Sequence, residues 1–154
     1  MSTPDLLFAE YRPGIYRYLC RVIGHADTAR DLTQDVFLRV TRAGVPDTDA
    51  DGRKAWVYQI ARNLALNHIR DRQRRPVSVD LVERPSNPTQ ELSVALAQAL
   101  ASLGELDRDV FLLRESGGLS YDEIAHTCEL TVLAVRSRLH RTRQHLRNIL
   151  KDSK

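Results

Sequence analysis

Residues 120–143 read SYDEIAHTCELTVLAVRSRLHRTR, and this stretch decides the fold. Its first four residues have the form of a capping box, S-x-x-E, in which Ser120 and Glu123 each satisfy a backbone N–H group at a helix start. A short helix with Ile124 and Ala125 facing inward, a three-residue turn and a longer basic helix follow. This order predicts a helix-turn-helix, the motif that places its second helix in the major groove of DNA.

The longer helix, which Thr131 caps and which we expect to reach about Leu150, has two different faces. Its apolar stripe consists of Val135, Leu139, Thr142, Leu146 and Ile149. Its polar face consists of Ser137, His140, Arg141 and Gln144, flanked by Leu133 and Arg136. Early residues of such a face can reach base edges, later arginines can bind phosphates, and the helix N-terminus offers free backbone N–H groups. The alternative is an amphipathic helix packed in a bundle.

Helical periodicity extends over the rest of the chain, and no strand pattern competes with it. We expect three helices in the first half, starting at Thr3-Pro4-Asp5, at Asp27 as a cap, and at about Arg53. We also expect a kink at Pro13-Gly14. Two more helices are expected at residues 92–103 and 107–115, and glycines end several of these elements: Gly44, Gly117 and Gly118.

The domain organisation follows from the prolines. Three of the six, Pro76, Pro85 and Pro88, fall in a stretch of little periodicity. We therefore predict an all-α protein of two small helical domains, 1–75 and 91–154, joined by a flexible linker at 76–90.

The net charge of +3 conceals an uneven distribution. Residues 53–75 carry seven Lys and Arg against one acidic residue, and residues 131–154 carry the same numbers. Residues 91–130 carry eight acidic residues against two basic ones. Two separate basic helices indicate two contacts with a polyanion, although basic helices can also be plain solvated surfaces.

The first basic helix has an outward face that combines amides, arginines and one apolar residue. This face consists of Gln59, Arg62, Asn63, Leu66, Arg70 and Gln73. Leu66 among polar side chains suits contact with unstacked bases. For Trp56, core packing is the favoured interpretation.

Other chemistry is poorly supported. Asp31 and Asp35, one helical turn apart, favour an acidic docking face over a metal site, because no third ligand joins them at ligand spacing. A plain solvated helix face is the alternative. Cys20 and Cys128 lie far apart, which argues against a disulfide or zinc site and favours a reducing cytoplasm. The chain has no membrane span, secretory signal or catalytic motif, so we expect no enzyme, no cofactor and no membrane insertion.

Five stretches resemble motifs of the extracytoplasmic-function (ECF) class of bacterial RNA polymerase sigma factors, in the sigma-70 family. Residues 31–40, DLTQDVFLRV, are similar to DLxQ(D/E)VFLRV, and residues 55–70, AWVYQIARNLALNHIR, to AWLxxIARNLAxDxxR. In the second half, the similar stretches are VFLLR at 110–114, GLSYDEIA at 118–125 and VRSRLHR at 135–141, the last resembling VKSRLxRAR.

The resemblance implies region 2 in the first half, region 4 in the second half, and a set of binding residues in each. It implies docking on core RNA polymerase, at its β′ coiled coil and β flap, with region 2 contributing Asp31, Leu32, Gln34, Asp35 and Phe37. It implies that the loop at 47–52 catches a base flipped out of the −10 element. It also implies that the −10 element is recognised by Gln59, Arg62, Asn63, Leu66, Asn67, Arg70 and Arg74. It implies −35 recognition by Thr131, Arg136, Ser137, His140 and Arg141. It also implies an anti-sigma partner.

Three positions depart from the family pattern. Glu129 stands where a turn glycine is usual, which costs about 1 kcal/mol if the backbone there is left-handed. Gly104 replaces a common proline, and Thr41 replaces a common aromatic residue. Two alternative functions stay open at this point: a stand-alone helix-turn-helix regulator, and a sigma mimic that only sequesters an anti-sigma factor.

Overall fold

The structure, a computed structural model, describes residues 3–74 and 88–152, with side chains placed for 3–74 and 94–151. Within these ranges every regular element is an α-helix, as predicted. The helices are α1 (Thr3–Ile23), α2 (Ala26–Ala43), α3 (Ala50–Arg74), α4 (Pro88–Ala101), α5 (Glu105–Glu115), α6 (Tyr121–Cys128) and α7 (Val132–Asp152). None of the described helices has the length and apolar character needed to cross a bilayer.

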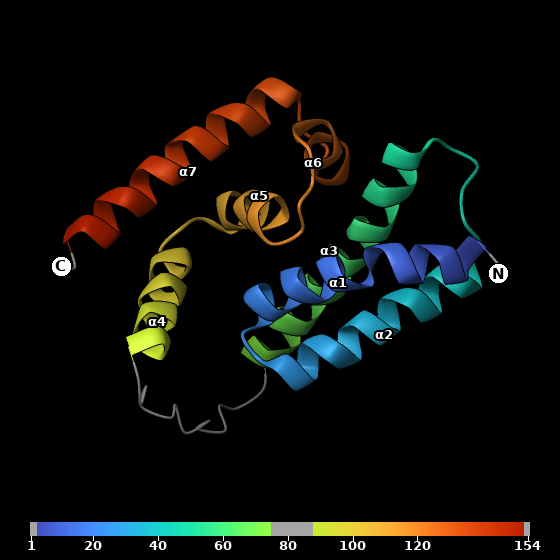
Figure 1. The fold of residues 1–154 in the computed structure, drawn as a ribbon, viewed down its shortest axis with the longest axis horizontal. Helices are drawn as coiled ribbons and strands as arrows, with labels where there is room; N and C mark the ends of the chain where they lie inside the picture. Colours follow the sequence, from blue (N-terminus) through green and yellow to red (C-terminus); the bar gives the residue numbers. More distant parts are fainter. Residues whose placement is uncertain (1–2, 75–87, 153–154) are drawn as a thin grey trace.

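The first half is a bundle of α1, α2 and α3, in which the three helices pack against one another (Figure 1). Each helix contributes an apolar stripe at helical spacing, and the stripes meet in one core. The fully buried members include Ile15 and Leu19 of α1, Val36 of α2, and Val57 and Ala61 of α3.

Two helix starts in this half differ from expectation. The N-cap of α2 is His25, not Asp27, and the ring nitrogen Nδ1 of His25 accepts from the Thr28 N–H at 3.3 Å. Helix α3 begins at Ala50, earlier than expected, because Asp49 Oδ1 accepts from the Gly52 N–H at 2.7 Å and satisfies the first turn. Helix α1 runs from Thr3 to Ile23 as one element and contains Pro13, where we expect a kink.

The second half places α5, α6 and α7 in mutual contact and packs α4 against α7. The capping box of α6 is confirmed: Ser120 Oγ accepts from the Glu123 N–H at 3.1 Å, and Glu123 Oε1 accepts from the Ser120 N–H at 2.8 Å. Thr131 caps α7 as predicted, with its Oγ1 accepting from the Ala134 N–H at 3.1 Å. Helix α4 already begins at Pro88, within the predicted linker, because proline suits the first turn of a helix. Residues 75–87 of the predicted linker lie outside the described residues.

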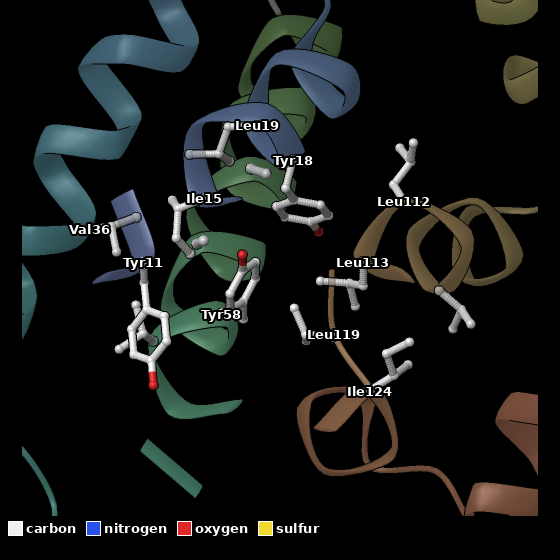
Figure 2. Packing of buried hydrophobic residues seen from close by; sticks show 14 of the residues in the cluster. Tyr11, Ile15, Tyr18, Leu19, Val36, Tyr58, Leu112, Leu113, Leu119 and Ile124 are labelled. Carbon is white, nitrogen blue, oxygen red and sulfur yellow. The ribbon is translucent and has the colours of Figure 1, made fainter. Parts of the chain in front are cut away.

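The two halves share a single core. Helix α3 packs against α6, and α1 packs against α5 (Figure 1). Tyr18 and Tyr58 of the first half lie toward Leu113 and Leu119 of the second half (Figure 2). All four side chains are at most 1% exposed, so the contact between the halves is as dry as the centre of either one.

The turn between α6 and α7 contains the one non-glycine residue with positive φ among the described residues. Glu129 adopts φ 57° and ψ 46°, the left-handed conformation that glycine adopts without a steric penalty. Its side chain is exposed, so the strain is confined to the backbone.

We predict that Glu129→Gly raises the free energy of unfolding by about 1 kcal/mol, because it removes the left-handed strain at a smaller entropic cost. The measurement is chemical denaturation followed by circular dichroism. Glu129→Ala is the matched control: it removes the same carboxylate but keeps a Cβ, so it should give no gain. An equal stability change in both variants would contradict the strain.

Candidate nucleic-acid interface

Helix α7 is fixed to α5 by two of its own arginines. Arg138 Nη1 lies 2.7 Å from Asp107 Oδ1, and Arg143 Nη2 lies 2.9 Å from Glu115 Oε1. The hydrogen bond from Arg143 to Glu115 raises the pKa of that guanidinium. Val135 and Leu139 are buried on the same side of the helix. The orientation of α7 is therefore determined by charge as well as by apolar packing.

The opposite side of α7 is open to solvent, and we call it the α7 face. It consists of the residues predicted for the −35 element: Thr131, Arg136, Ser137, His140 and Arg141, all exposed. The Thr131 hydroxyl oxygen accepts a hydrogen bond from the Ala134 N–H, so Thr131 acts here as a helix cap. A hollow of about 240 Å³ adjoins this face and is lined by Tyr121, Arg136, His140, Arg143, Gln144 and Arg147. Its basic lining suits a phosphate group.

Sequence reasoning gave Leu133 no role of its own, although it placed the residue beside the polar face. In the structure Leu133 lies in the first turn of α7 and its side chain is 70% exposed. Among the described residues it is not part of the apolar core, and an exposed apolar side chain at this position can contact a thymine methyl group in the major groove.

The residues predicted for the −10 element divide into two groups on α3. Asn63, Asn67, Arg70 and Arg74 are exposed. Gln59, Arg62 and Leu66 are half-buried and face the second half of the chain. Gln59 Nε2 donates to the carbonyl oxygen of His126 at 3.2 Å, and Leu66 lines a narrow space together with Leu112. The outward face expected from the sequence is thus only partly a free surface.

Arg62 takes part in a buried network between the halves. Its Nε donates to Asp109 Oδ2, and the Tyr18 hydroxyl donates to Asp109 Oδ1. Burial lowers the pKa of Arg62, but the hydrogen bond and negative charge of Asp109 outweigh that effect and raise it overall. Burial, together with the neighbouring Asp109 charge, raises the pKa of Tyr18 well above its usual range. The hydroxyl therefore remains a donor and the guanidinium remains charged.

A hollow of about 400 Å³ lies between the end of α2 and the exposed part of α3. Its lining consists of Arg39, Arg42, Ala43, Trp56, Ile60 and Asn63. Trp56 is half-buried, so it packs on the core and also borders this hollow. Arg53 Nη1, in the first turn of α3, donates to the carbonyl oxygen of Thr48 in the preceding loop at 2.7 Å. Sequence reasoning missed Arg39 and Arg42, because their proximity to Trp56 arises only when α2 and α3 pack.

The residues predicted to dock on polymerase form a mixed set on α2. Asp31, Gln34 and Asp35 are exposed. Leu32 and Phe37 are buried, and the Phe37 ring packs edge-on against Phe8 with ring centroids 4.9 Å apart. Two of the five residues therefore hold α2 in the bundle, and the other three form its polar surface. Leu38 adds an apolar side chain, 54% exposed, on the same helix.

Two known protein families match the chain, one in each half. Residues 7–75 match Sigma-70 region 2, and residues 93–146 match Sigma-70, region 4. The chain is 36% identical to the ECF RNA polymerase sigma factor SigE of Mycolicibacterium smegmatis over 97% of its own length, but it spans only 62% of that relative. It is 32% identical to the ECF RNA polymerase sigma-E factor of Escherichia coli K12, covering 94% of this chain and 84% of the relative.

Solved structures show the same architecture. CnrH, determined in complex with the cytosolic domain of CnrY, superposes with a TM-score of 0.73 at 25% identity, covering 98% of this chain and 89% of CnrH. The sigma factor RpoE of Bartonella quintana, determined with the anti-sigma factor NepR, superposes with a TM-score of 0.70 at 22% identity, covering 97% and 98% of the two chains. Taken with the paired region 2 and region 4 matches, this establishes that the chain belongs to the ECF class of sigma-70 family RNA polymerase sigma factors, the proteins that direct transcription initiation.

Proposed function

We propose that this sigma factor binds core RNA polymerase through α2 and brings it to promoters by reading the −35 element with α7 and the −10 element with α3. One observation carries the proposal: α7 uses Arg138 and Arg143 to hold itself on α5 while it exposes Arg136 and Arg141. A helix anchored in this way presents its free side chains in one orientation, as base reading in a major groove requires.

The −35 contact would combine base edges and phosphates. Arg136, Ser137 and His140 in the first turns can reach base edges, and Leu133 can contact a thymine methyl group. Arg141 and the basic hollow beside Tyr121 can bind phosphates. Neutralising several phosphates makes such binding fall steeply with salt concentration.

The −10 contact would involve unpaired bases. Asn63 borders the hollow near Trp56, where two arginines and an aromatic ring are available for a base and its phosphate. Asn67, Arg70 and Arg74 continue the exposed surface along α3. Strand opening by this route needs no catalytic group, because binding of unpaired bases shifts the equilibrium toward the open duplex. The proposal therefore requires neither enzyme chemistry nor a cofactor.

The protein partners follow from charge and from the solved relatives. Asp31, Gln34 and Asp35 give α2 an acidic surface that complements a basic helical partner, which we propose to be the β′ coiled coil, with the β flap contacting the second half. The Bartonella RpoE was solved with the anti-sigma factor NepR, and CnrH was solved with the cytosolic domain of CnrY. We propose an anti-sigma partner for this chain as well. Such a sigma factor works where polymerase works, in the bacterial cytoplasm.

The direct test is transcription of a genomic fragment library by core polymerase with and without the purified protein. The proposal predicts new transcripts that start at defined positions and share two sequence elements. A stand-alone regulator would bind duplex DNA without yielding transcripts, and a sigma mimic would give neither binding nor transcripts.

For the α7 face, we predict that Arg141→Ala weakens holoenzyme binding to a promoter duplex found in that library by about ten- to a hundredfold, since a hydrogen bond to a charged group such as a phosphate is worth about 1.5–3 kcal/mol. Fluorescence anisotropy at constant salt measures the change. Lys151→Ala removes the same charge from the last turn of α7 and should leave affinity within a few-fold. An equal loss of promoter affinity in the two variants would show that Arg141 contributes only its charge and makes no specific contact with the DNA.

For the α2 surface, we predict that Asp31→Arg and Asp35→Arg each weaken binding to core polymerase by about tenfold or more, because like charges then meet across the contact. Competition against a labelled reference sigma factor provides the measurement. Asp27→Arg, on the same helix, is the control; its pairing with Arg30 at 3.8 Å is a surface contact of small value. A loss of the same size in the control would place the polymerase contact elsewhere.

A further inference from the structure

Part of the α3 surface proposed for the −10 element is already covered by the second half of the chain. Gln59 Nε2 donates to the carbonyl oxygens of His126 and Thr127, at 3.2 and 3.5 Å. Arg62 is paired with the Asp109 carboxylate, and Leu66 borders residues of α5. Side chains that would meet DNA in the holoenzyme meet protein in this structure.

The covering groups are acidic where α3 is basic. Asp109 holds Arg62, and Glu123 Oε2 lies 3.3 Å from Lys54 Nζ. Asp109 and Glu123 are each only 7% exposed. A carboxylate presents to a guanidinium or ammonium group the same kind of charged oxygen acceptors as a phosphate. The acidic stretch 91–130 therefore lies against the basic stretch 53–75 of the same chain.

The contact is also closely fitted around these ion pairs. The Tyr58 hydroxyl donates to the Gly117 carbonyl at 3.0 Å, and Arg17 Nε donates to the Ser116 carbonyl at 3.2 Å. A Cβ added at Gly14 would lie 2.4 Å from the Tyr58 oxygen, so glycine permits this approach. The α7 face, in contrast, is left exposed by the same arrangement.

We propose that α5 and α6 act as an internal substitute for the −10 strand, so that the free chain masks its own −10 surface while its −35 surface stays available. This inference rests on the proposed function of α3. Burying a charge pair is costly in itself. Another anion that binds the paired cations can therefore displace the carboxylates from this contact. DNA or polymerase then competes with α5 and α6, and the affinity of the free chain for a single strand is reduced by the fraction of molecules that are open.

The first test uses the free full-length protein and a short single-stranded DNA of mixed sequence. Asp109→Asn keeps the size of the side chain but removes the charge that holds Arg62. We expect it to bind this strand about tenfold more tightly than the wild type, measured by fluorescence anisotropy at constant salt. Asp107→Asn is the matched control, since it removes the same charge from α5 but breaks a pair with Arg138 inside the second half.

A second variant avoids leaving a buried cation unpaired. Arg17→Ala removes the hydrogen bond to Ser116 across the contact and also removes a positive charge, yet we expect tighter binding of the strand. Arg12→Ala, also exposed on α1 and placed over the Phe8 ring of the same helix, loses the same charge without that bond and should bind no more tightly than the wild type.

Cys128 reports opening without any DNA. It is half-buried beside Asp109 and Arg62, and burial raises its thiol pKa to about 12. Opening should expose the thiol and accelerate its alkylation, read by mass spectrometry relative to the alkylation rate of the same thiol in denaturant. Arg17→Ala is the decisive variant here, because Asp109→Asn also changes the charge next to the thiol.

Faster alkylation of Cys128 together with tighter strand binding in Arg17→Ala and Asp109→Asn, relative to their controls, would support masking. Faster alkylation without tighter binding would show that the covered part of α3 is no DNA surface. Unchanged alkylation and unchanged binding in both variants would show that this contact does not mask α3. If the wild-type holoenzyme still yields promoter-dependent transcripts, either negative result overturns the masking alone and leaves the proposed function standing.

Discussion

The carboxylate of Asp109 is the group on which the arrangement of the two halves depends. It is nearly inaccessible to water, and a buried carboxylate without partners is costly. Its partners, the Tyr18 hydroxyl and the Arg62 guanidinium, come from α1 and α3 of the other half. In the docked arrangement the first half supplies both partners of this buried charge, and Tyr18, Leu66 and Leu112 line the narrow space beside the pair.

This docking divides the molecular surface by role. The α7 face and the acidic part of α2 lie away from the contact and are exposed. Helix α3 is shared: its exposed residues adjoin the hollow near Trp56, and its covered residues bind the carboxylates and backbone carbonyls of α5 and α6. The surface of α3 for unpaired bases is covered, whereas the α7 face for duplex DNA is free. We therefore expect the duplex contact of α7 to form before the single-strand contact of α3.

Local signals in the sequence were sufficient for much of the fold and for part of the site. The capping box at Ser120, the cap at Thr131 and the period of α7 predict the helix-turn-helix because each acts within a few residues. His25 was not predicted as the N-cap of α2, because histidine is an unusual N-cap residue. The packing of Arg62 and Leu66 against the second half was also not predicted. Helical periodicity shows that they face away from their own bundle, but it does not show that a second bundle covers them.

Small-angle X-ray scattering from the free full-length protein is the most direct test of the packed arrangement. One body of 154 residues should give a radius of gyration of about 15–17 Å and a single compact scattering envelope. Charge reversal at the central pair, Asp109→Arg, should expand the particle, and Asp107→Arg should not. A two-lobed wild-type particle, with a radius of gyration of about 20 Å or more, would show that the halves are independent and would contradict the account.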